Sequence, residues 1–173
     1  MLFILIPGLI LVAFMVWAST RIKKTAAAAF DAETIETDEF IIQKPSGFLY
    51  VINGDPKYAV EAYSKEYGMS GAEEFRQGRV YLTIHNGETL DNIVSSVSTS
   101  GERVIDDFTE VIGTKHYRVV ETKRTEKDID FRVIYKLAES DGKVYKLEAI
   151  QLAKNSEEFL SKVEALINSF ELK

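Results

Sequence analysis

Apolar positions follow two different patterns along the chain. No side chain from residue 2 to residue 20 is charged. From residue 40 onward, apolar and polar residues instead alternate in short stretches, as at Val80, Leu82 and Ile84. A continuous apolar run is typical of a membrane-spanning helix, whereas alternation is typical of a strand with one buried face. The sequence therefore predicts an N-terminal apolar helix followed by a body rich in β-strands.

The N-terminal run has the length of one membrane-spanning helix. At about 1.5 Å per residue its helix would be about 28 Å long, close to the bilayer's hydrocarbon thickness of roughly 30 Å. An indole near the far end and three cations directly after it suit the headgroup level. We expect a retained single-span anchor that includes Leu2, Ile10, Phe14, Trp17, Arg21, Lys23 and Lys24.

A cleaved secretory signal is the alternative to a retained anchor. Such a signal carries positive charge before its apolar core and a small-x-small site after it. Here the cations follow the core, and only the alanines at residues 26–29 offer a cleavage site. The positive-inside bias then places the folded body on the cytoplasmic side, with a periplasmic or lumenal body as the alternative.

The body contains several stretches with the alternation and composition of strands. They are EFIIQKP, GFLYVING, RVYLTIHNG, ERVIDDFTEV, TKHYRVVETKR, DIDFRVIYKLAE and KVYKLEAIQLA. Ile129, Phe131, Val133, Tyr135 and Leu137 share one face of such a strand. Between the last two stretches, the sequence Ser-Asp-Gly at residues 140–142 predicts a hairpin, because Asp-Gly adopts the positive φ angles that tight turns need.

Three helices are predicted between and after the strands. Asp55 and Pro56 offer a cap and a first turn for a helix that Gly68 would close. A second helix begins at Thr89. The third follows Asn155, which we expect to cap it with Glu158 reaching back; its apolar stripe is Phe159, Leu160, Val163, Leu166, Ile167 and Phe170.

Runs of neighbouring strands favour a mainly antiparallel sheet flanked by helices. The predicted fold class is therefore α+β, an α-β-α sandwich preceded by a transmembrane helix. We expect three parts: the anchor with its basic flank over residues 1–24, an acidic linker over 25–38 and the folded domain over 39–173.

Composition and charge exclude several functional classes. The chain has no cysteine, which rules out disulfides, thiolate metal sites and cysteine nucleophiles. The formal net charge is −6, and without the three cations beside the apolar run the remainder carries −9. Because phosphates repel such a body, we expect no nucleic-acid partner.

No motif predicts catalysis or metal binding. The two histidines, His85 and His116, lack a second ligand at metal-site spacing. The paired carboxylates lack the alternating pattern of a calcium loop. No serine lies in a nucleophile elbow, and the Gly-rich stretch at residues 68–71 lacks the lysine of a phosphate loop. We therefore expect no enzyme activity, no metal and no cofactor.

Two groups of residues are candidates for contacts with other proteins. Tyr50, Tyr58, Tyr63 and Tyr67 cluster around the first hairpin and the first predicted helix. Because tyrosine combines a large contact area with a polar tip, the cluster could form a binding face, line an apolar pocket or simply pack at the core's edge. The second group is a basic patch in an acidic domain, namely Arg118, Lys123, Arg124 and Lys127.

The order of these elements resembles a known family. The stretch ending in KPSGF leads to a capped helix, a strand and the helix TLDNIVSSV; then come ERVIDDFTEVIGTKHYRVVETKR, the hairpin FRVIYKLAESDGKVYKLEAIQL and a last helix ending in LINSFEL. This pattern resembles the Mog1/PsbP-like α-β-α sandwich over residues 40–172. The resemblance implies a non-enzymatic accessory domain that binds protein partners, notably in photosynthetic membranes. The N-terminal anchor departs from that family, whose members usually follow a cleaved signal.

These features predict an accessory or assembly subunit of a membrane protein complex, photosynthetic or respiratory. Its partners would be subunits of that complex, with the bilayer contacted through the anchor. A membrane-tethered module that binds a small apolar molecule between sheet and helix is the alternative. An enzyme with an unrecognised site is a third hypothesis.

Overall fold

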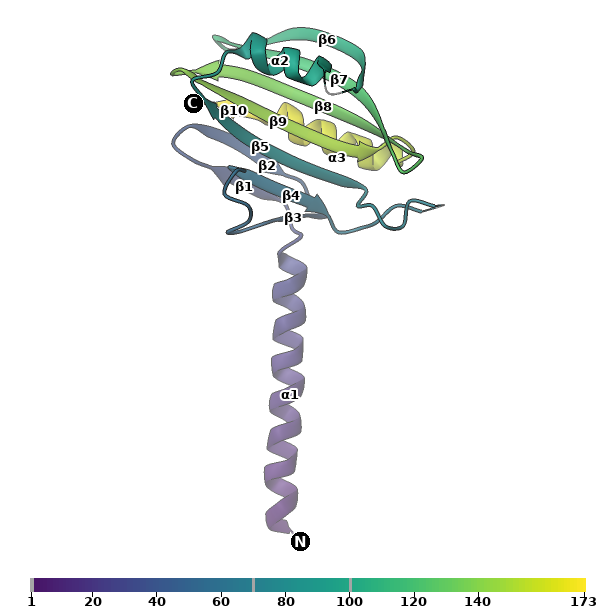
Figure 1. The fold of residues 1–173 in the computed structure, drawn as a ribbon. Helices are drawn as coiled ribbons and strands as arrows, with labels where there is room; N and C mark the ends of the chain where they lie inside the picture. Colours follow the sequence, from purple (N-terminus) through teal and green to yellow (C-terminus); the bar gives the residue numbers. More distant parts are fainter. Residues whose placement is uncertain (1, 70, 100) are drawn as a thin grey trace.

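The computed structural model describes residues 2–69, 71–99 and 101–173, with the side chains of residues 2–9 and 98 outside the description. Three helices and ten strands follow one another along the chain (Figure 1). They are α1 (Leu2–Ala28), β1 (Glu33–Glu36), β2 (Phe40–Lys44), β3 (Phe48–Tyr50), β4 (Val60–Ser64), β5 (Gly78–Asn86), α2 (Leu90–Thr99), β6 (Arg103–Ile112), β7 (Lys115–Glu126), β8 (Ile129–Ser140), β9 (Lys143–Leu152), α3 (Glu157–Asn168) and β10 (Glu171–Leu172).

The main feature is a seven-stranded sheet in the order β3-β4-β5-β9-β8-β7-β6, and all of its pairs are antiparallel. A smaller sheet has the order β1-β2-β10. The expected hairpin between β8 and β9 is present, with positive φ angles at Asp141 and Gly142. The prediction of an α+β fold with mainly antiparallel sheets is confirmed.

Each face of the large sheet buries its own apolar cluster. On β8, Phe131, Val133 and Tyr135 pack with the inner residues of α2, as the alternation predicted. Ile134 and Ala138 point the other way, into a cluster that also holds residues of α3 and of the small sheet. Helix α3 and the small sheet therefore cover one face, and α2 covers part of the other (Figure 1).

Helix α3 forms where its apolar stripe predicted, but a different residue caps it. The hydroxyl of Ser156 accepts the hydrogen bond from the Phe159 N–H at 3.3 Å. Asn155, the expected cap, instead donates from Nδ2 to the Gln77 carbonyl at 2.8 Å, and Glu158 pairs with Lys162 at 2.7 Å. The prediction of an Asn155 cap with Glu158 reaching back is wrong, because a loop carbonyl occupies the Asn155 amide.

The helix predicted from Asp55 to Gly68 does not form. Asp55 Oδ1 accepts a hydrogen bond from the Lys57 N–H at 3.0 Å, so the Asp-Pro pair makes a turn only. Residues 60–64 then form β4, in which residues 60, 62 and 64 are buried and the two between them are partly exposed. The alternation of buried and partly exposed residues, typical of a strand, thus prevails over the helix-capping signal, because β4 pairs with β3 on one side and with β5 on the other.

Helix α1 projects from the body and ends at Ala28, four residues beyond the expected anchor (Figure 1). In the part of the chain that the structure describes, no helix is both long and apolar enough to cross a bilayer. From residue 10, where described side chains begin, the uninterrupted apolar run ends at Ala18, and Arg21, Lys23 and Lys24 lie inside the same helix. This finding overturns the prediction of a single-pass membrane protein, on whichever side its body was placed.

The residues assigned to the anchor lie along α1. The side chain of Leu2 is outside the described part of the structure. Ile10, Phe14 and Trp17 are exposed, and the Arg21 guanidinium lies 5.3 Å from the centroid of the Trp17 ring. Lys23 and Lys24 are exposed too. None of the described side chains among them belongs to either buried apolar cluster of the body.

The segment after α1 is bound to the body, although we expected residues 25–38 to be a linker. Strand β1 pairs with β2 along its whole length. The ammonium of Lys44, a buried residue of β2, donates to the carbonyls of Phe48 at 2.8 Å and Ala29 at 3.5 Å, and to that of Asp31. Burial lowers the pKa of this ammonium. Lys44 thus joins the end of α1 to the body.

A second buried lysine connects the large sheet to α3. Lys136 of β8 is fully buried, and its ammonium lies 2.6 Å from Glu110 of β6 and 3.2 Å from the Ile167 carbonyl of α3. The Tyr117 ring lies 4.7 Å from the same nitrogen. The side chain of Glu110, by contrast, is 31% exposed.

We predict an asymmetry between the two members of this ion pair. Glu110→Gln leaves a buried ammonium without its counter-charge and should lower the free energy of unfolding by about 3 kcal/mol. Lys136→Met leaves a carboxylate that water reaches, so its cost should be clearly smaller. Urea unfolding of both variants measures this. Equal costs would contradict the view that burial of the lysine governs the pair.

Candidate functional site

The four predicted tyrosines do not share one face of the large sheet. Tyr50 in β3 pairs opposite Ala62 and packs against the buried cluster that α3 covers. Tyr63 alternates with the buried residues of β4 and therefore points to the opposite face. The structure thus separates Tyr50 from the other three.

Tyr63 and Tyr67 enclose an arginine that sequence reasoning missed. The Arg76 guanidinium carbon lies 4.6 Å from the Tyr63 ring centroid and 4.2 Å from that of Tyr67. Its Nη1 also donates to the carbonyls of Ser64 at 2.9 Å and Lys65 at 2.8 Å. Two rings and two carbonyls therefore fix the guanidinium in one orientation, with Tyr67 still 47% exposed.

Tyr58 forms a second aromatic contact on the same face. It stacks on Tyr81 of β5 with ring centroids 4.4 Å apart, and Lys57 Nζ lies 4.5 Å from the Tyr58 centroid. Partial burial raises the pKa of the Tyr81 phenol above its ordinary value. We call Tyr58, Tyr63, Tyr67, Arg76 and Tyr81 the tyrosine–arginine surface. The alternation of residues 78–86 already placed Tyr81 opposite the buried residues, but no local pattern identified Arg76.

The basic patch is neutralised by neighbouring carboxylates. Each of its four cations lies within 3.3 Å of one: Arg118 of Asp107, Lys123 of Asp130, Arg124 of Glu102 and Lys127 of Glu74. The hydrogen bond from Lys123 holds the pKa of the Asp130 carboxyl below its ordinary value. These residues therefore offer no net positive charge to a partner.

The two histidines lie apart from each other and from any metal-binding arrangement. His85 Nδ1 lies 3.1 Å from Glu88 Oε1, and His116 is exposed on β7 opposite Val111. Within residues 2–69, 71–99 and 101–173, no group of three or more histidine, aspartate or glutamate side chains is placed to hold a metal ion.

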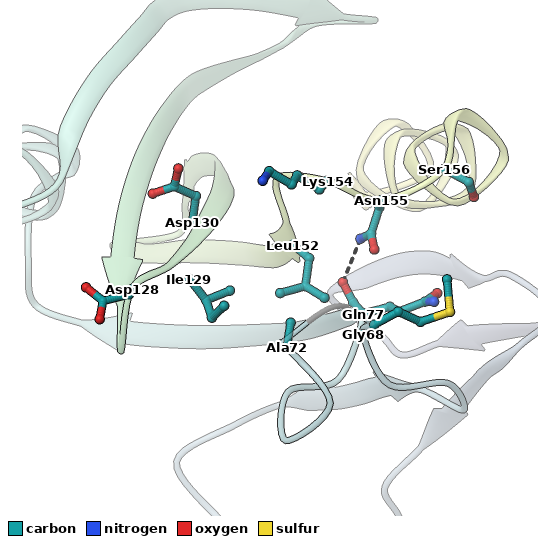
Figure 2. A pocket seen from close by; sticks show the side chains of 11 residues that line it. Gly68, Ala72, Gln77, Asp128, Ile129, Asp130, Leu152, Lys154, Asn155 and Ser156 are labelled. Atoms are coloured by element: carbon teal, nitrogen blue, oxygen red, sulfur yellow. Dashed lines mark hydrogen bonds between the residues drawn. The ribbon is translucent and has the colours of Figure 1, made fainter.

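A pocket of about 450 Å³ lies at the end of the large sheet (Figure 2). Its aliphatic wall consists of Ala72, Ile129 and Leu152. Gly68 closes one side, where a Cβ atom would come within 2.5 Å of Leu152. The loop between β4 and β5 therefore approaches β9 closely enough to shape one wall of the pocket.

Charged groups stand around this pocket without converging on its centre. Figure 2 shows Asp130 and Lys154 on the side opposite Ala72, with Asp128 beside Ile129. Asp130 is already held by Lys123 at 2.9 Å and by the Thr125 hydroxyl at 2.7 Å. The pocket thus has a small aliphatic wall and a rim that carries both signs of charge.

This pocket differs from the one expected for an apolar ligand. That ligand was expected between sheet and helix, among aromatic side chains. In the described part of the chain the space beneath α3 is filled by the buried cluster that includes Phe48, Val163, Leu166 and Phe170. The pocket lies beyond the end of β9 instead, and no aromatic residue lines it.

Comparison with known proteins finds likeness in structure only. No protein-family model and no curated protein sequence matches the chain. PsbP from the cyanobacterium Synechocystis has a TM-score of 0.58 and 13% identity, and the match covers 84% of this chain and 94% of that protein. LpqN, involved in cell envelope biogenesis of Mycobacterium tuberculosis, has a TM-score of 0.60 and 7% identity over 83% and 91% of the two chains.

The Ran-binding protein Mog1p of Saccharomyces cerevisiae is a third structural neighbour. Its TM-score is 0.52 at 9% identity, and the match covers 83% of this chain and 96% of Mog1p. Identities this low show the fold alone. The resemblance expected from the order of elements is confirmed at that level: the chain has a Mog1/PsbP-like α-β fold.

Proposed function

We propose that this chain is a non-catalytic accessory subunit that docks onto a protein partner through the tyrosine–arginine surface. The observation that carries the proposal is the guanidinium of Arg76, held between Tyr63 and Tyr67 near β4, on the part of the sheet face that lies away from α2 (Figure 1). Tyrosine and arginine are enriched among the residues that dominate binding energy at protein interfaces.

Pre-organisation makes this surface suited to docking. A free arginine side chain loses rotamer entropy when a partner orders it. Here two loop carbonyls and two rings fix Arg76 before any partner binds. Among the structural neighbours, Mog1p is a Ran-binding protein, which supports a protein rather than a nucleic acid as partner. The net charge of the chain supports the same choice.

We predict that substitutions within this surface weaken the complex selectively. Tyr67→Ala removes one ring from the stack and should weaken binding by roughly tenfold or more, about 1.4 kcal/mol. Tyr67→Phe keeps the ring and should bind like the wild type. Arg76→Lys keeps the charge but loses the planar fork, and should behave like Tyr67→Ala.

The measurement starts from the tagged full chain, purified from its own cells and sized under native conditions with mass spectrometry of what comigrates. Calorimetry with the purified partner then compares the variants, and Tyr50→Phe on the opposite face serves as the control. Equal affinities for Tyr67→Ala and Tyr50→Phe, or recovery of a lone 19.5 kDa chain, would sink the proposal.

The pocket beyond β9 favours a second candidate function, the binding of a small molecule. Its volume of about 450 Å³ lies in the range of ligand sites, roughly 300–1,000 Å³. An amphipathic compound would place its apolar part on Leu152 and Ile129 and a charged group at the rim.

Native mass spectrometry of the purified chain separates the two candidates. If the pocket is the functional site, the wild type should carry a stoichiometric added mass that Ala72→Leu, which narrows the pocket, lacks. Thermal melting confirms that this variant is folded. If docking is the function, the wild type should carry no such mass and Ala72→Leu should keep its affinity for the partner.

A further inference from the structure

Strand β6 forms a long, exposed edge of the large sheet. It pairs with β7 on one side and ends the strand order on the other, far from α1 (Figure 1). It has ten residues, whereas β3 at the opposite edge has three. Such an edge offers a row of free backbone groups to another strand.

The hydrogen-bond register shows which groups of β6 face outward. A two-residue turn with Gly113 at φ +61° joins Ile112 to Lys115, the pair nearest the loop. In such a hairpin that pair exchanges both its hydrogen bonds, and pairs alternate from there. The alternation turns three N–H groups outward, those of Asp107, Thr109 and Val111. The Asp107 N–H accordingly finds its partner in the Asp106 carboxylate at 2.9 Å, not in β7.

The side chains of β6 are apolar as well as accessible. Val104, Ile105, Phe108 and Val111 are between 40% and 58% exposed. A bulge between Val104 and Asp106 limits the regular part of the edge to the residues that follow it. This part presents apolar side chains on both faces of the sheet.

The strand is held rigidly in place. Glu102, just before it, contacts the Tyr135 hydroxyl at 3.0 Å and Arg124 at 3.3 Å. Further along, Asp107 accepts from Arg118 at 2.7 Å and Glu110 pairs with the buried Lys136. An incoming strand would thus meet a template that is already ordered.

A second copy of this chain fits the edge poorly. If two copies of β6 paired antiparallel with Phe108 opposite Phe108, Asp106 of each copy would lie opposite Glu110 of the other. If the strands paired about Asp107 or Glu110, that carboxylate would lie opposite the same carboxylate of the other copy. Pairing about Thr109 would place Phe108 opposite Glu110. Like charges directly opposite each other destabilise a strand pair. Asp107 pairs with Arg118 and Glu110 with the buried Lys136, whereas no cation of the described residues pairs with Asp106. The edge thus opposes a like-charged strand and is open, at Asp106 above all, to a strand of opposite charge.

We propose that the β6 edge binds an extended segment of a partner protein by strand addition, and that this segment alternates apolar and basic side chains. Its backbone would pair with the outward groups of Thr109 and Val111 and with the Asp107 carbonyl. Asp106, Phe108 and Glu110 share one face of β6, whereas Thr109 and Val111 share the other. The cations of the segment would therefore lie beside Asp106 and Glu110, and its apolar side chains beside Thr109 and Val111. The body's net charge of −9 without the α1 cations attracts such a segment.

This site is separate from the tyrosine–arginine surface. The latter lies on β4, β5 and the loop between them, and β9, β8 and β7 separate those strands from β6. The inference therefore stands or falls independently of the proposed docking function.

The test uses a capped ten-residue peptide of alternating lysine and valine, titrated into the full chain. Amide resonances and hydrogen exchange should locate the peptide on β6, with new protection at Thr109 and Val111. Thr109→Pro removes an outward N–H without breaking a bond to β7, and should weaken binding by roughly tenfold or more. Thr109→Val keeps the N–H and is the matched control.

A second variant and a second peptide provide independent checks of this proposal. Val111→Lys places a cation among the apolar side chains of the peptide without altering the backbone, so it should weaken binding even if Thr109→Pro fails to fold. A peptide of alternating glutamate and valine should not bind. Equal binding by the proline variant and its control, or shifts spread over acidic surfaces away from β6, would overturn the proposal. So would self-association of the wild type that Thr109→Pro abolishes, because it would make a second copy the occupant.

Discussion

The buried ammonium of Lys136 is the contact on which the arrangement of this fold most depends. A charge without access to water is tolerated only when its surroundings satisfy it completely. Glu110 of β6, the Ile167 carbonyl of α3 and the Tyr117 ring of β7 provide that environment together. The hairpin of β6 and β7 and the later helix α3 must therefore be in place around β8 at once, which fixes α3 across the sheet and β6 at its edge.

That constraint makes the large sheet a rigid platform with functional surfaces at its two ends. Near β4 and β5, α2 leaves one face uncovered, and there Arg76 is held between Tyr63 and Tyr67. At the far end, β6 offers its backbone edge. In the part of the chain that the structure describes, neither surface has a group of side chains placed to hold a metal ion. Both are suited to binding a partner, which is why we propose docking and not catalysis.

The sequence was most informative where one interaction dominated. Alternation identified the strands of the large sheet except β4, and the stripe of α3 identified the helix on top of it. The helix predicted from Asp55 to Gly68 was wrong, because an N-cap and a proline are local signals. The pairing of β4 with two neighbouring strands is a tertiary interaction that stabilises the strand instead. The prediction of a membrane anchor was wrong because no helix of the described residues is both long and apolar enough to cross a bilayer, and three cations lie within α1.

The candidate site was only partly predictable. A cluster of tyrosines in the sequence does not say which face each one occupies. Tyr50 and Tyr63 lie on neighbouring strands but on opposite faces, which follows only from the register of β3 with β4. Arg76 had no signal of its own, because its position between two rings depends on how the loop from residue 65 to residue 77 folds back on β4.

The central claim, that the tyrosine–arginine surface is a docking face, is tested most directly by hydrogen–deuterium exchange of the chain alone and in its native complex. The account predicts that protection gained in the complex concentrates on β4, β5 and the loop between them, and spares the outer face of α3. Protection confined to α3 or to the small sheet, with residues 58–81 exchanging as in the free chain, would contradict it.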